Sequence, residues 1–267
     1  MIHNLTRNRP VRLFIILGGF FIANALIAEV IGVKIFSLEK TFGFEPFSFS
    51  LFGQNGLGFS LTAGVLLWPV VFIMTDIINE YYGPKGVRLL SYLTVGLIAY
   101  AYLAFTAAIY LVPPDWWPGS NKNVPDLQRA YRAVLGQSNW IIIGSLIAFL
   151  VGQVVDVFAF HRIKKVTGEN KIWLRATGST LVSQLIDSYI VLVVAFYIGA
   201  DWSLAQVLAI GTVNYIYKFL MAIVLTPVIY LVHGIIEKYL GHETAAKLKH
   251  AAMGKNDEPF GNIPASG

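Results

Sequence analysis

The chain of 267 residues lacks cysteine and has few charged side chains. Without cysteine it can form no disulfide and has no thiol nucleophile. Charged residues make up 13% of the sequence, about half the share found in a soluble domain, whereas 56% are hydrophobic. The five histidines follow no metal-ligand spacing, and no hydrolase motif or phosphate-binding glycine loop is present. The composition therefore argues against an enzyme, a metal site or a bound cofactor, and it indicates a membrane protein.

Six apolar stretches approach or reach the roughly 20 residues that a helix needs to cross a bilayer. They predict an all-α polytopic membrane protein, a bundle of six transmembrane helices. The stretches cover residues 13–31, 57–78, 87–112, 140–160, 177–198 and 204–232. A signal peptide is the disfavoured interpretation of the first stretch, because the run is long for one and no small-residue cleavage site follows closely.

The apolar stretches divide the chain into three parts. Residues 1–12 are expected to form a cytoplasmic N-terminal segment and residues 13–236 the six-helix transmembrane domain. Residues 237–267 are expected to form a charged, partly disordered cytoplasmic tail that frays.

The polar connections show how the helices are anchored and packed. Residues 34–58 interleave phenylalanine with polar residues, so we expect these rings at the membrane interface or folded back into the bundle. Tryptophans flank the long polar loop 115–139 and predict an aromatic belt. Small residues that recur every fourth position in the fourth span predict a close helix neighbour; they are Gly144, Ala148 and Gly152.

The distribution of basic residues predicts the orientation. With both termini in the cytoplasm, fourteen of the twenty lysines and arginines fall on the inner side, five fall on the outer side, and Lys218 alone lies within the membrane. The positive net charge is thereby explained by loop charges, and no nucleic-acid partner is expected. The inner side would include the basic connection from residue 162 to residue 175.

Polar residues inside the spans are candidates for function, because ionisable groups in a bilayer are costly and face a partner or a cavity. Helical spacing puts Asp76, Asn79 and Glu80 on one face of the second span, which Gly83-Pro84 ends. At about 1.5 Å per residue, Asp187 and Lys218 lie near the midplane.

Two amide and carboxylate pairs, Gln153 with Asp156 and Gln184 with Asp187, repeat at three-residue spacing and suit a ligand that presents both donors and an acceptor. Simpler interpretations stay open: Asp187 and Lys218 as a structural ion pair, and Asp76 and Glu80 as partners of Arg88 or of the basic connection.

The chain resembles the queuosine-precursor transporters, a six-span family of bacterial inner-membrane uptake proteins. The stretches that carry this resemblance are Asn24 to Lys34, Asp76-Ile-Ile-Asn-Glu80-Tyr-Tyr-Gly83, Gln153-Val-Val-Asp156, Arg175 to Asp187-Ser188 and Tyr215 to Lys218. The resemblance implies uptake of 7-cyano-7-deazaguanine or 7-aminomethyl-7-deazaguanine for tRNA queuosine modification. It also implies a fold similar to vitamin-binding membrane subunits. The alternative is a substrate-binding subunit of a vitamin or nucleobase importer that needs a separate ATPase.

A guanine-like ligand fits the polar residues of the spans. Its N1-H and 2-amino group are adjacent donors that one carboxylate can accept, and its O6 can accept from an amide or a lysine. The predicted substrate-binding residues are Asn24, Trp68, Asp76, Asn79, Glu80, Gln153, Asp156, Gln184, Asp187, Asn214 and Lys218. The expected partners are this base and membrane lipid; a homodimer, the coupling ion and the preferred base stay open.

Overall fold

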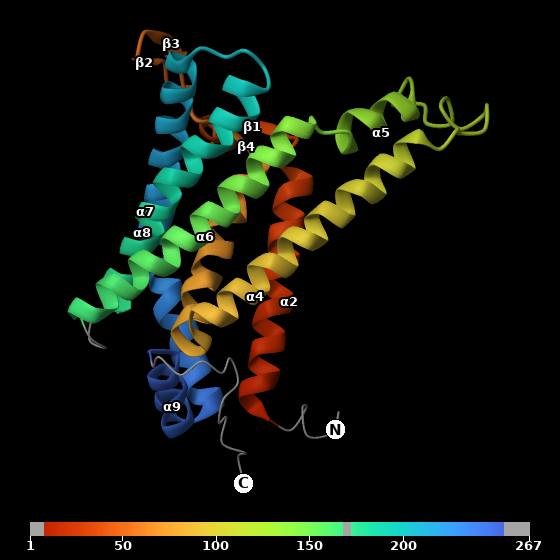
Figure 1. Ribbon diagram of the computed structural model, residues 1–267. Coiled ribbons are helices and arrows are strands. Elements are labelled where there is room, and N and C mark those ends of the chain that lie inside the picture. The colour runs from red at the N-terminus through yellow and green to blue at the C-terminus, as the bar shows by residue number, and fades with distance from the viewer. Residues whose placement is uncertain (1–7, 168–171, 254–267) are drawn as a thin grey trace.

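The computed structural model describes residues 8–167 and 172–253 and is mostly helical (Figure 1). Short strands and a 3-10 turn connect the first two long helices, and a π-helical turn follows α7. The helices are α2 (Arg9–Ile31), α3 (Leu38–Thr41), η1 (Ala63–Leu66), α4 (Trp68–Tyr110), α5 (Leu127–Leu135), α6 (Asn139–Thr167), α7 (Ile172–Leu192), η2 (Val193–Ile198), α8 (Leu204–Leu240) and α9 (His242–Met253). The helical class predicted from the sequence is confirmed.

Five helical segments of the described residues are long and apolar enough to cross a membrane. One of them contains α4, which is 43 residues long and is broken at Gly83, where φ is 67° and ψ is −175°. Pro84 follows directly and cannot donate a backbone hydrogen bond. Figure 1 shows the two halves of α4 running in different directions from this point. The predicted break at Gly83-Pro84 is therefore present, while the count of six spans and their orientation stay predictions.

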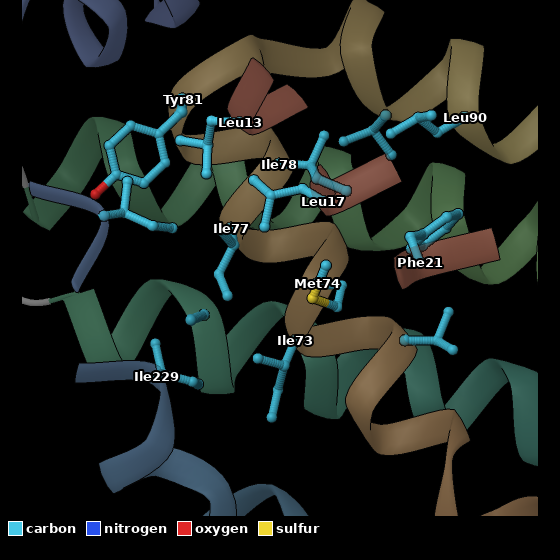
Figure 2. Packing of buried hydrophobic residues seen from close by; sticks show 14 of the residues in the cluster. Leu13, Leu17, Phe21, Ile73, Met74, Ile77, Ile78, Tyr81, Leu90 and Ile229 are labelled. Atoms are coloured by element: carbon cyan, nitrogen blue, oxygen red, sulfur yellow. The ribbon is translucent and has the colours of Figure 1, made fainter. Parts of the chain in front are cut away.

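The main apolar core joins α2 to the first half of α4 (Figure 2). Leu13, Leu17 and Phe21 follow one another at four-residue spacing on α2 and are all buried. They pack in one cluster with buried side chains of α4 that include Ile77 and Tyr81. In a membrane such contacts hold helices together by van der Waals packing rather than by exclusion of water.

Helices α6 and α7 approach each other very closely. A Cβ atom at Gly144 would lie 3.1 Å from the carbonyl oxygen of Val191 and 3.2 Å from the amide nitrogen of Ala195. Ala148 and Gly152 are buried on the same face. The close neighbour predicted from the four-residue spacing of small residues is therefore confirmed, and it is α7 with the turn after it.

The segment between α2 and α4 contains four short strands, which the all-α prediction did not include. Strand β1 (Ile35–Ser37) pairs with β4 (Ser60–Thr62), and β2 (Phe49–Leu51) pairs with β3 (Gln54–Leu57), both antiparallel. The helix predicted from residue 57 consequently starts at Trp68, because residues 60–62 are held by strand pairing. Phenylalanines of this segment are largely exposed; they are Phe42, Phe44, Phe47 and Phe52.

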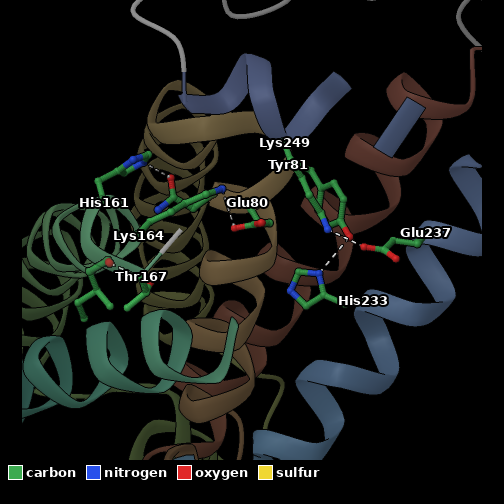
Figure 3. Close-up of polar contacts among 10 residues, drawn as sticks. Glu80, Tyr81, His161, Lys164, Thr167, His233, Glu237 and Lys249 are labelled. Carbon is green, nitrogen blue, oxygen red and sulfur yellow. Dashed lines mark hydrogen bonds and ion pairs between the residues drawn. The ribbon is translucent and has the colours of Figure 1, made fainter. Parts of the chain in front are cut away.

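The C-terminal region also differs from the prediction. Residues 237–253 are mostly helical: α8 continues to Leu240, and Gly241, with φ 82°, turns the chain into α9. Helix α9 is held because Ala245 and Leu248 are buried and Lys249 Nζ lies 2.5 Å from Glu237 Oε1 (Figure 3). The rest of the predicted tail, residues 254–267, lies outside the described residues.

Two predicted loops contain helix. Helix α5 lies within the polar loop 115–139, and its N-cap Asp126 accepts a hydrogen bond from the Arg129 amide at 3.0 Å. Helix α6 runs to Thr167, so the first residues of the basic connection, Lys164 among them, are helical. The prediction assigned these cations to a loop. Basic residues do not by themselves end a helix, so α6 continues through them.

Candidate functional site

A cavity of about 340 Å³ opens among α2, η1, α6, α7 and α8 beside strand β1. Its volume suits a small heterocyclic ligand, since ligand pockets are commonly about 300–1,000 Å³. Most of its wall is apolar, and several polar side chains enter it. The polar and aromatic lining residues are Glu29, Trp68, Gln137, Ser145, Asp187, Ser188, Asn214 and Lys218.

One side of the cavity carries an ion pair between α7 and α8. Lys218 Nζ donates to Asp187 Oδ2 at 2.5 Å, and the two side chains are 6% and 15% exposed. Within the described residues, no hydrogen bond reaches Asp187 Oδ1, and the buried Ser188 hydroxyl next to it has no partner. The pair therefore keeps acceptor and donor capacity that a ligand in the cavity can use.

The same cavity is lined by a second carboxyl group, on α2. Glu29 Oε2 accepts a hydrogen bond from the Ser145 hydroxyl of α6 at 2.7 Å. The Gln137 side chain donates to the Glu29 carbonyl oxygen at 2.9 Å. The predicted site omitted Glu29, although a glutamate inside an apolar span is a signal that identifies it. Asp187 and Glu29 thus line one cavity from two helices.

A separate group of buried polar residues, here called the polar layer, joins the first half of α4 to α6 and α7. Asp76 is 1% exposed and accepts from the hydroxyls of Ser179 at 3.0 Å and Thr180 at 2.9 Å. Asp156 is fully buried and accepts from the Ser183 hydroxyl at 3.0 Å. Hydroxyls one helical turn apart on α7 therefore donate hydrogen bonds to two carboxyl groups, one from α4 and one from α6.

The end of the polar layer nearest α9 contains an ion pair and an amide contact (Figure 3). Lys164 Nζ lies 3.0 Å from Glu80 Oε2, and each side chain is 1% exposed. Asn79 Oδ1 lies 3.1 Å from His161 Nε2. Glu80 thus contacts a cation that the sequence placed in the basic connection, although in a buried site, whereas Asp76 accepts from the hydroxyls of α7.

The two predicted glutamines are buried but lie in different surroundings. Gln153 Oε1 accepts from Thr75 at 3.0 Å and from Ser91 at 3.4 Å, while its Nε2 has no partner. Neither polar atom of the Gln184 side chain has a partner, and this residue borders a small space of about 10 Å³ together with Lys218. Gln184 thus lies next to the ion pair of the main cavity.

The structure separates the predicted site residues into groups. The main cavity contains Trp68, Asp187, Asn214 and Lys218. The polar layer contains Asp76, Asn79, Glu80, Gln153 and Asp156. Asn24 donates to the carbonyl oxygen of Phe20 on its own helix at 2.8 Å. Among the residues described, no three histidine, aspartate or glutamate side chains are grouped as a metal site would require.

Comparisons with known proteins identify relatives of the chain. The profile of a family described as "Putative vitamin uptake transporter" matches residues 62–232, which include α4, α6, α7 and most of α8. A protein of Bacillus subtilis named probable queuosine precursor transporter is 28% identical over 65% of this chain and 72% of its own. Queuosine precursor transporter of Escherichia coli is 26% identical over 63% and 70%. No solved structure matches the chain.

Proposed function

Because the chain belongs to the vitamin uptake transporter family, we propose that it carries 7-cyano- or 7-aminomethyl-7-deazaguanine, the precursors of queuosine, across a membrane. Two relatives that share a quarter or more of their aligned residues with it are named for queuosine precursors. The observation that carries the proposal is the Asp187–Lys218 pair on the wall of the 340 Å³ cavity.

The chemistry of the cavity matches a guanine-type edge. The carboxylate of Asp187 can accept both N1-H and the 2-amino group, and Lys218 or Asn214 can donate to O6. Trp68 offers an aromatic wall of the same cavity. Glu29, which lines the same cavity, could meet the cationic 7-aminomethyl group of one precursor. An adenine-type edge would bring a ring nitrogen acceptor against Asp187, and binding would fail.

The proposed topology has six spans, with the two halves of α4 as separate crossings that meet at Gly83. The sequence predicts a break at Gly83-Pro84, and the backbone is non-helical at Gly83, where the first half of α4 ends and the second half begins. Most lysines and arginines then lie on the side of Lys85 and α9, which would be cytoplasmic. Reporter fusions at Asn121 and after Thr167 test it: an external signal from the first and a cytoplasmic signal from the second are expected. A cytoplasmic signal at Asn121 contradicts the topology.

Uptake in cells tests the proposed substrate. Cells that cannot synthesise the precursor are supplied with the external base and this chain, and queuosine in their tRNA is measured. We expect queuosine to return, excess adenine to have no effect and guanine to compete weakly, because the cavity must also hold the 7-substituent. Absence of queuosine despite membrane expression contradicts the substrate assignment, while competition by adenine contradicts the carboxylate contact.

The energy source needs a second measurement with purified protein. The chain reconstituted alone in vesicles is expected to accumulate the labelled base, as a self-contained transporter would. If uptake appears in cells but never in vesicles that contain this chain alone, it is the binding subunit of an importer that needs a separate ATPase.

The variant Asp187→Asn tests the pair directly. An amide cannot accept both donors of the base, and losing a charged contact of this kind costs about 2–5 kcal/mol. We expect folded protein with base binding weakened at least tenfold, measured by isothermal titration. Binding equal to that of the unmodified chain would remove Asp187 from the site.

A further inference from the structure

A second large space lies on the outside of the bundle, between the second half of α4 and α6. Its volume is about 550 Å³. It shares no lining residue with the cavity that contains Asp187 and Lys218. The proposed transport function does not use it, so it needs its own explanation.

Two helical stripes form the walls of this groove. On α6, Val154, Phe158 and Arg162 follow one another at four-residue spacing, and on α4 Arg88 and Tyr92 do the same. The apolar members are strongly exposed, with Val154, Phe158 and Tyr92 each more than 60% accessible. Exposed apolar walls of this kind on a membrane-spanning helix face acyl chains.

The end of the groove nearest the break in α4 is basic. Arg88 comes from α4, and Arg162 and Lys165 come from the last turns of α6. Within the described residues, no carboxylate lies in ion-pair distance of any of these three cations. The guanidinium of Arg162 lies 5.2 Å from the centre of the Phe158 ring, which links the basic end to the apolar wall.

We propose that this groove binds an anionic phospholipid, with the phosphate at Arg88, Arg162 and Lys165 and an acyl chain along Phe158 and Val154. Basic pockets between transmembrane helices are the sites where anionic headgroups bind. The order of the contacts, three cations at one end and then an apolar wall, matches the order of groups in such a lipid. A transported base has no acyl chain to cover the wall, and its aminomethyl form would be repelled by the cations.

Native mass spectrometry of the purified chain in neutral detergent tests this site. Phosphatidylglycerol and phosphatidylcholine with the same acyl chains are added in turn, and the lipid retained per protein is measured. We expect one phosphatidylglycerol to be retained at concentrations where phosphatidylcholine is lost. The variant Arg88→Gln/Arg162→Gln should weaken phosphatidylglycerol binding by roughly 30-fold, since each cation near a lipid surface contributes about a factor of five.

A matched control removes two exposed cations elsewhere. Arg132→Gln/Lys238→Gln lies outside the groove and should bind the lipid as the unmodified chain does. A variant that fills the wall instead, Val154→Trp, keeps all three cations and should also reduce retention. It covers the case in which the double arginine variant does not fold.

The outcomes separate the lipid from other ligands. Equal retention of the two lipids, or full retention by both groove variants, overturns the proposal. Glycerophosphoglycerol is the same singly charged phosphodiester headgroup without an acyl chain: if it displaces phosphatidylglycerol at similar concentration, the site binds free phosphate esters and the lipid assignment is wrong. None of these readings depends on transport, so they stand whether or not the chain carries a deazaguanine.

Discussion

The Asp187–Lys218 and Glu80–Lys164 pairs have the same chemistry in different surroundings. Both join a carboxylate to a lysine on a neighbouring helix, at 2.5 Å and 3.0 Å. The first lines an open cavity, and the second is 1% exposed on both sides within the polar layer. A charge beside a cavity can exchange its partner for a ligand or water, whereas a charge in a sealed layer cannot. We therefore expect the first pair to contribute to substrate binding and the second to contribute to stability.

The largest expected effect on stability comes from replacing the lysine of each pair by methionine. Lys164→Met leaves Glu80 without this partner in a sealed site, and breaking a buried pair costs about 3–5 kcal/mol. The thermal unfolding midpoint in detergent should fall by roughly 10 °C. Lys218→Met should cost less, about 1–2 kcal/mol, because Asp187 borders the cavity and can be hydrated.

The two substitutions should affect uptake in the opposite order: Lys218→Met should reduce uptake more than Lys164→Met does. Lys218→Met is expected to abolish uptake in folded protein. The comparison breaks down if Lys218→Met unfolds the chain as much as Lys164→Met does, or if it transports at the full rate. The double variant Asp187→Asn/Lys218→Met should recover expression without recovering uptake.

A second, smaller difference in stability is expected between removing a hydroxyl donor in the polar layer and removing one beside the cavity. Thr180→Val keeps the shape of the side chain but removes the donor to Asp76, and a buried acceptor that loses its donor costs about 1–3 kcal/mol. Ser145→Ala removes the donor to Glu29, whose carboxyl borders the cavity, and should cost about 1 kcal/mol or less. Denaturation midpoints of the two variants measure the difference. Equal losses would show that the cavity is as dry as the polar layer.

The break in α4 predicts a further effect of moderate size. Gly83 has a positive φ and lies close to α9: a Cβ atom there would be 3.1 Å from the carbonyl oxygen of Ala252. Gly83→Ala should therefore destabilise the chain by about 1–3 kcal/mol, because its backbone lies in a region that is essentially restricted to glycine. Gly96 is the matched control in the same helix, since nothing lies within 4 Å of its Cβ position. Gly96→Ala should leave the midpoint unchanged or raise it, and a loss at both positions would argue against a role of the break.

The smallest expected effect concerns the strand segment beside the cavity, outside the spans. Burial raises the pKa of Glu39, but hydrogen bonds from the Phe59 amide at 2.7 Å and the Ser37 hydroxyl at 2.9 Å outweigh it, and the net pKa is lowered below 4.5. A lowered pKa stabilises the folded form above the unfolded pKa, and this contribution is lost as the pH falls through the folded pKa. The expected contribution is therefore a loss of stability on acidification that depends on Glu39.

Unfolding midpoints between pH 7 and pH 3 test this linkage. The unmodified chain should lose more stability on acidification than Glu39→Gln, whose side chain does not titrate. Parallel curves for the two proteins would show that Glu39 contributes nothing to the acid response.

Much of the helical arrangement could be predicted because each signal is local. Apolar runs long enough for a bilayer predict helices, Gly83-Pro84 predicts a break, and the spacing of Gly144, Ala148 and Gly152 predicts a close neighbour. The strands of residues 35–62 could not be predicted in this way, because their pairing joins β1 to β4 across more than twenty residues. The same holds for α9, which depends on contacts with α4 and α8.

The sequence by itself determined which residues carry charge inside the apolar spans, since composition and helical spacing suffice to find Asp76, Asp156, Asp187 and Lys218. Only the tertiary structure decided which of them face a cavity. Asp156 is sealed by α4 and α7, whereas Asp187, at the corresponding position of the Gln-x-x-Asp pattern, borders open space. Helical periodicity gives the direction of a side chain on its own helix, but the space in front of it is set by neighbouring helices that are distant in sequence.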